Sequence, residues 1–152
     1  MNDKRVVAHL GVIWQSMRWV LRKEVESRTL IDSPAALRDY LRLSYGFDRY
    51  EQVRVLYLDA RSRLLREQQF DRGTADEATV CVGQLIMIGL GLGSQSFIIV
   101  HNHPSGDPTP SRTDRQFTRQ IASAARELGM TLHDHLIVTE GGDFSFRQSG
   151  LL

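Results

Sequence analysis

The chain has 152 residues, of which 41% are hydrophobic and 24% are charged, and its formal net charge is +1. This length suits one domain that buries roughly two thirds of its unfolded surface and holds a core without covalent staples. The single cysteine, Cys81, excludes an internal disulfide, and the N-terminus leads into no apolar signal core. We therefore expect a cytoplasmic protein.

Residues 78–102 form the longest stretch that is poor in charge. Glycines and polar residues interrupt it, so it predicts a buried helix followed by a buried strand and no contact with a membrane. The N-terminal half carries more Lys and Arg than Asp and Glu, and the C-terminal half carries fewer. This asymmetry is typical of a solvated surface and also compatible with contact to nucleic acid or another acidic partner.

The N-terminal residues 1–46 predict a helical cap on a main domain formed by residues 47–152. Apolar residues recur at helical spacing over residues 5–26 and predict an amphipathic helix whose apolar stripe needs a partner. A serine followed by a proline then marks the start of a second helix over residues 34–44.

In the main domain, β-branched and aromatic runs separated by turn residues predict strands, and amphipathic runs predict helices between them. The helix over residues 74–90 is apolar almost all round, which indicates burial against the sheet or, through residues 78–90, against a second copy of the chain. This order of elements predicts an α/β or α+β sandwich with a mixed sheet packed between helices. The predicted strands cover residues 52–59, 64–70, 96–100 and 131–139, the predicted helices cover 74–90 and 112–128, and a short segment covers 143–147.

The run from His101 to Asp114 carries two imidazoles, a hydroxyl and a carboxylate at the junction of a buried strand and a helix. Side chains two apart in a strand point the same way, so His101 and His103 are expected to converge. Ser111 followed three residues later by Asp114 is a helix-start signal. Capping alone is the simpler role for this pair.

Helical phase gives Asp114 a second possible role, because it lies in the middle of the apolar stripe of the helix that follows. An inward-facing carboxylate is costly unless a cation or a hydrogen-bond donor compensates it. Two histidines and one carboxylate suit one Zn²⁺ per chain with a fourth position open, although core hydrogen bonds remain the alternative for either histidine alone. The stripe consists of Phe117, Ile121, Ala125 and Leu128.

The spacing H-x-H-x7-S-x-x-D resembles the signature of the JAMM (JAB/MPN-plus) metalloproteases, and His-Asn-His-Pro-Ser-Gly resembles their RadC branch. Segments before and after this motif agree as well, so the resemblance covers about residues 5–152. It implies a JAB/MPN, cytidine-deaminase-like sandwich. It also implies a zinc-dependent hydrolase that cleaves a peptide or isopeptide bond of a peptide or protein substrate through a metal-activated water.

The resemblance carries roles over to individual residues. Ser111 maps to the serine that hydrogen-bonds the oxyanion, and Glu51, just ahead of the first core strand, maps to the general base. Glu67 is the nearest competing acid. The implied zinc ligands are His101, His103 and Asp114.

Other candidate residues are given mostly structural roles. His133 and His135 flank Asp134 with two-residue spacing but have no third ligand, which favours a structural role, with Asp134 orienting a zinc-ligating histidine. Cys81 lies in the apolar helix and is expected in the core, with nothing nearby to activate it.

The chain departs from long RadC proteins in two features. It has none of the paired glycine-containing turns of their N-terminal helix-hairpin-helix module. It also reads Val82-Gly83-Gln84 with an apolar continuation where the family usually has a Pro-Arg-Glu start and a charged face. A DNA-repair-associated or DNA-binding accessory protein with little catalysis is the alternative function. An inactive scaffold is a third.

Overall fold

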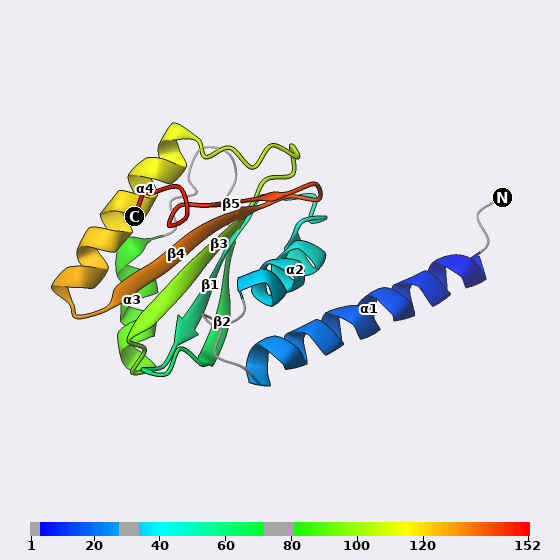
Figure 1. The fold of residues 1–152 in the computed structure, drawn as a ribbon, viewed down its shortest axis with the longest axis horizontal. Coiled ribbons are helices and arrows are strands. Elements are labelled where there is room, and N and C mark those ends of the chain that lie inside the picture. Colours follow the sequence, from blue (N-terminus) through cyan, green and yellow to red (C-terminus); the bar gives the residue numbers. More distant parts are fainter. Residues whose placement is uncertain (1–3, 28–33, 72–80) are drawn as a thin grey trace.

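We describe a computed structural model of the chain that places residues 4–27, 34–71 and 81–152. In these residues a five-stranded sheet has the order β2-β1-β3-β4-β5, with β3 and β4 parallel and the other pairs antiparallel (Figure 1). The predicted mixed sheet is therefore confirmed. The strands are β1 (Gln52–Leu58), β2 (Leu64–Asp71), β3 (Ser96–Asn102), β4 (Thr131–Val138) and β5 (Asp143–Ser145).

Helices cover both faces of the sheet, as the sequence predicts. Helix α2 (Pro34–Tyr45) covers one face, and α3 (Val82–Gly91) and α4 (Arg112–Glu127) cover the other (Figure 1). Helix α1 (Lys4–Ser27) contacts the body of the protein from its middle, where the ring of Trp14 lies edge-on to that of Phe47 at 4.9 Å, to Leu21, which packs against the core beneath α2. Its N-terminal part extends away from the body (Figure 1). The result is an α+β sandwich.

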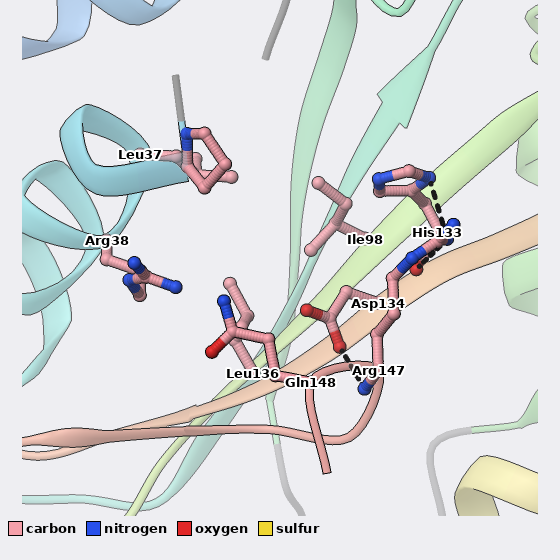
Figure 2. A pocket seen from close by; sticks show the side chains of 9 residues that line it. Leu37, Arg38, Ile98, His133, Asp134, Leu136, Arg147 and Gln148 are labelled. Atoms are coloured by element: carbon pink, nitrogen blue, oxygen red, sulfur yellow. Dashed lines mark hydrogen bonds between the residues drawn. The ribbon is translucent and has the colours of Figure 1, made fainter. Parts of the chain in front are cut away.

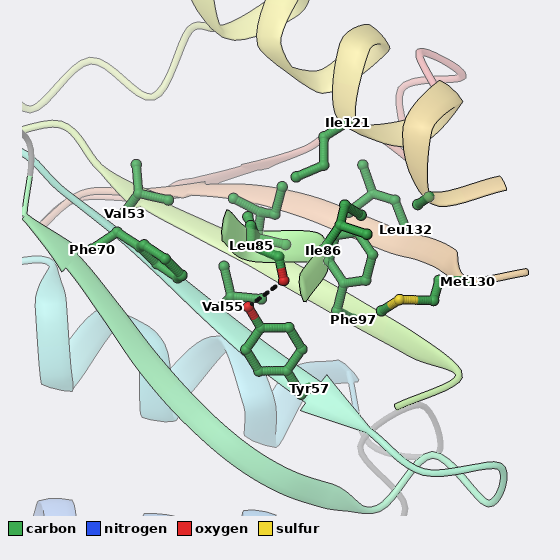
Figure 3. Close-up of a cluster of buried hydrophobic side chains, with 12 residues drawn as sticks. Val53, Val55, Tyr57, Phe70, Leu85, Ile86, Phe97, Ile121, Met130 and Leu132 are labelled. Atoms are coloured by element: carbon green, nitrogen blue, oxygen red, sulfur yellow. Dashed lines mark hydrogen bonds between the residues drawn. The ribbon is translucent and has the colours of Figure 1, made fainter. Parts of the chain in front are cut away.

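Alternation along the strands divides the buried side chains into two cores, one on each face of the sheet. Figure 3 shows the core beneath α3 and α4, in which Phe97 lies close to Ile86, Leu132 and Met130. The hydroxyl of Tyr57 donates to the carbonyl of Leu85 at 2.9 Å within this core. The core under α2 is built from Leu37, Tyr40, Leu41, Tyr45, Leu56, Leu58, Ile98, Val100, Leu136 and Val138.

The predicted helix over residues 74–90 begins later than expected. Cys81 has an extended backbone (φ −68°, ψ 111°) at the N-cap position, so α3 starts at Val82, and residues 74–80 lie outside the described part of the chain. Cys81 is exposed, and its predicted place in the core is wrong. The reason is that the strand-like N-cap places it ahead of the helical turn that faces the sheet.

The apolar stripe of α4 also ends differently from the prediction. Ile121 and Ala125 are fully buried, but Leu128 is 53% exposed. The helix stops at Glu127, and Gly129 turns the chain with a positive φ of 72°. Because of this turn, Met130 instead of Leu128 fills the core.

Strand β4 contains an irregularity that sets which side chains face α4. Phe97 pairs with Leu132 but Ile98 pairs with Asp134, so His133 is an extra residue in the ladder. Arg147 Nη1 donates to the carbonyl of His133 at 3.1 Å. Beyond this bulge, His135 faces α4 and Asp134 faces α2.

No helix in the described ranges is long and apolar enough to cross a membrane.

Gly46, just after α2, lies against two backbone carbonyls, and a Cβ added there would be 2.7 Å from the oxygens of both Arg42 and Thr139. We expect Gly46→Ala to lower the free energy of unfolding by about 1–3 kcal/mol, because neither carbonyl can move without breaking local packing. Urea denaturation measures the change. Gly141→Ala, where a Cβ meets nothing within 4 Å, is the matched control. Equal stability of the two variants would contradict the crowding at Gly46.

Candidate metal centre

Two histidines and two carboxylates meet at the end of β3. His101, the penultimate residue of the strand, has Nε2 2.6 Å from Glu51 Oε1 and Nδ1 3.1 Å from Asp114 Oδ1. Glu51 precedes β1, which pairs with β3 through Val53 and His101, and Asp114 lies in the first turn of α4. Three separate segments thus deliver the predicted side chains to one point.

His103 follows β3 in the loop that leads to α4. Its Nδ1 lies 2.8 Å from the carbonyl oxygen of Asp107, and because a carbonyl only accepts, Nδ1 carries a proton. Its Nε2 faces Asp114 Oδ2 at 3.5 Å and Glu51 Oε1 at 3.9 Å. The hydrogen bond to Asp114 raises the pKa of His103 despite partial burial. Nε2 therefore lies between two carboxylates, in a position that favours a cation.

The donor set fits a metal ion. One ligand atom each from Glu51, His101 and His103 lies within 4.8 Å of the others, and the Asp114 carboxylate contacts both imidazoles. A backbone carbonyl that fixes the tautomer of His103 and leaves Nε2 for a ligand is a common arrangement around bound metals. Imidazole and carboxylate donors suit zinc and related transition metals. These residues can hold such an ion.

Asp114 is an inward-facing acid, as its helical phase predicts, and it is 4% exposed. It also completes a capping box: Asp114 N donates to Ser111 Oγ at 3.1 Å, and Ser111 N donates to Asp114 Oδ2 at 2.8 Å. Burial alone would raise the pKa of this carboxyl, but hydrogen bonds from the two histidines and Ser111 hold it far below its usual range. Capping and the predicted ligand position are therefore compatible in one side chain.

Ser111 lies beside the cluster. Its hydroxyl donates to Asp114 Oδ2 at 2.6 Å. The histidine and aspartate are closed off from solvent, since the side chains of His101 and Asp114 are 3% and 5% exposed, whereas that of Glu51 is 36% exposed. A molecule from solution thus reaches the cluster from the side of Glu51. The individual roles of these residues remain predictions.

Asn102 positions Glu51, and the sequence analysis missed this residue. Its Oδ1 accepts from the backbone N–H of Gln52 at 2.7 Å, and its Nδ2 donates to the carbonyl of Tyr50 at 2.9 Å. The side chain therefore holds the backbone on both sides of Glu51. A polar residue inside a strand that otherwise reads as buried was the available signal, because such a group must find partners.

Asp134 is placed away from the two histidines. Its Oδ1 accepts from the backbone N–H groups of His135 and Arg147, and its Oδ2 accepts from the hydroxyl of Ser145. Asp134 and Arg147 line a pocket between α2 and the sheet (Figure 2). The pocket has a volume of about 300 Å³ and lies on the α2 face, whereas the cluster lies on the α4 face. The structure thus does not bring Asp134 to a position from which it could orient His101 or His103.

Glu67, the competing acid, is also engaged elsewhere. Its carboxylate accepts from the hydroxyls of Tyr40, at 3.1 Å, and Tyr45, and it pairs with Arg54 at 3.3 Å. Burial and then the charge of Glu67 raise the pKa of Tyr45. This network ties α2 to the β1–β2 hairpin, so of the two candidate bases Glu51 is the one that lies beside the histidines.

The comparisons with known proteins identify the family of this chain. A family model described as the RadC-like JAB domain matches residues 31–151. The UPF0758 protein of Rhodobacter capsulatus is 40% identical over 147 residues, which cover 97% of this chain and 69% of that protein. For the UPF0758 protein SPO0054 of Ruegeria pomeroyi the identity is also 40%, over 97% of this chain and 66% of the relative. The chain therefore spans about two thirds of the length of these relatives, and it belongs to the RadC-like JAB domain family.

Proposed function

We propose that the protein is a zinc-dependent hydrolase that cleaves a peptide or isopeptide bond. The observation that carries this proposal is the convergence of two imidazoles with one closed-off and one solvent-accessible carboxylate. Membership of the RadC-like JAB domain family supports it.

In this proposal His101, His103 and Asp114 hold the ion. Zinc in such a site supplies a Lewis acid and lowers the pKa of water to around 7. The partly exposed carboxylate of Glu51 accepts a proton from the attacking water and returns it to the leaving amine. Ser111, whose single hydroxyl proton goes to Asp114 in this structure, turns to donate it to the oxygen of the scissile carbonyl.

Measurements of zinc affinity distinguish the proposed zinc ligands from the proposed general base. We expect apo wild type to take up one zinc per chain in isothermal titration calorimetry, and Asp114→Asn and His103→Ala to bind it at least ten-fold more weakly because each removes a ligand. Glu51→Gln keeps the shape of the side chain but not its basicity, so we expect near wild-type zinc affinity and a loss of hydrolysis of at least about 100-fold. Wild type that takes up no zinc would contradict the proposal, and weak zinc binding by Glu51→Gln would make Glu51 a ligand.

The substrate is best sought with the same pair of proteins. A cell extract is incubated with zinc-loaded wild type or with Glu51→Gln, and mass spectrometry then compares new N-termini and newly freed lysine side chains. Peptide-bond cleavage produces the former, and isopeptide cleavage produces the latter. If both proteins give the same set, the hydrolase proposal is wrong.

Asn102 provides a test of how Glu51 is positioned. Asn102→Asp keeps the acceptor for Gln52 N but loses the donor to the Tyr50 carbonyl, so the segment that carries Glu51 is expected to shift. Because misplacement of a catalytic group by 1 Å can cost about 100-fold in rate, we expect hydrolysis to fall at least 10-fold with zinc affinity within about 3-fold. Gln148→Glu, the same chemical change at an exposed position away from Glu51, is the control. Unchanged hydrolysis by Asn102→Asp would show that the hydrogen bonds of Asn102 do not position Glu51 for the reaction.

The alternative from the sequence, a DNA-binding accessory role, stays a prediction. A salt titration of DNA binding tests it, since contacts with several phosphates weaken steeply as salt rises.

A further inference from the structure

His135 occupies a fully buried position directly behind the metal centre. Its ring stacks on that of His101, with centroids 6.1 Å apart and an angle of 17° between the planes. On its other side the ring of Phe146 stacks at 4.7 Å and 8°. The ring of His101, a candidate metal ligand, thus packs against the ring of a histidine on the neighbouring strand β4.

A hydroxyl connects the same histidine to α4. His135 Nδ1 lies 2.7 Å from Thr118 Oγ1, and Thr118 Oγ1 lies 2.6 Å from the backbone carbonyl of Asp114. The carbonyl only accepts, so the hydroxyl donates to Asp114 and accepts from the Nδ1–H of His135. These two hydrogen bonds fasten the first turn of α4 to β4.

The other nitrogen of His135 makes packing alone a poor explanation of this residue. With Nδ1 protonated and the ring neutral, Nε2 is a bare acceptor, and it is buried without a hydrogen-bond partner among the described residues. An unsatisfied polar atom in a core costs free energy, and a phenylalanine would fill a slot between two stacked rings without that cost. The histidine is therefore best explained by what Nδ1 does.

Two sets of hydrogen bonds hold Asp114, and they act on different parts of the structure. The capping box with Ser111 fixes the carboxylate relative to its own helix, because both partners lie in the same turn. The Thr118–His135 link fixes that turn relative to the sheet, which carries His101. Of these two, the Thr118–His135 link is the one that bears on the separation between Asp114 on α4 and His101 on β3.

We propose that Thr118 and His135 are positioning residues that set Asp114 and His101 at the spacing the metal requires. This inference rests on the proposed metal-dependent function. It places neither residue in contact with the ion or the substrate.

The test separates metal affinity from stability. We expect His135→Phe to bind zinc 10–100-fold more weakly than wild type in isothermal titration calorimetry, the range typical when a hydrogen-bond partner of a metal site is lost. The melting temperature of its apo form should be unchanged or higher, because stacking is kept and the unsatisfied nitrogen is removed. The control His133→Gln, at the bulge next to this position, should bind zinc as wild type does.

Thr118 gives an independent check with a conservative rescue. Thr118→Val keeps the shape and removes the hydroxyl, and it should weaken zinc binding at least 10-fold. Thr118→Ser restores the hydroxyl and should return affinity to within about 3-fold of wild type. In the Co²⁺-loaded proteins, the visible absorption bands should change in His135→Phe and Thr118→Val but not in Thr118→Ser.

The possible failures are distinguishable. Wild type that takes up no zinc overturns the proposed function and this inference with it. Wild type that binds zinc while His135→Phe and Thr118→Val bind equally well overturns the inference alone. A parallel fall of zinc affinity and apo melting temperature in His135→Phe also overturns it, because the role would then be structural.

Discussion

The buried carboxylate of Asp114 is the constraint on which the rest of this structure depends. A negative charge that is only 4% exposed must be compensated within the fold, and here two imidazoles, the hydroxyl of Ser111 and the backbone N–H of Ser111 all converge on it. The loop after β3, which carries His103, and the start of α4, which carries Ser111, meet that requirement. The same imidazole and carboxylate groups are suited to bind a metal ion.

The sheet supplies the scaffold that makes this convergence possible. Parallel pairing of β3 with β4 needs a crossover, and α4 is that crossover, so the residue that begins it lies beside the end of β3. Antiparallel pairing of β1 with β3 brings the start of β1, and with it Glu51, to the same edge. Asn102 fastens this junction from the opposite face of β3, so the ligand strand also holds the predicted base.

Much of this could be predicted from the sequence because the determining patterns are local. Hydrophobic periodicity gave the helices and strands, and helical phase predicted that Asp114 faces inward, which the structure confirms. Contacts between distant segments could not be predicted in this way. The hydrogen bonds of Asn102 on both sides of Glu51 and the Thr118–His135 link depend on strand register and on the distance between elements. The start of α3 and the exposure of Leu128 depend on backbone turns, which hydrophobic periodicity does not report.

The bulge at His133 changes which face of the sheet the later side chains of β4 occupy. Strict alternation would have placed Leu132 and Asp134 on one face, yet Leu132 belongs to the core beneath α4 and Asp134 faces α2. The ladder in fact needs no residue at position 133: a chain that lacked it would join Leu132 directly to Asp134 and keep every later side chain on its present face. A change of one residue in strand length at this position would therefore leave the later side chains of β4, His135 among them, on their present faces of the sheet.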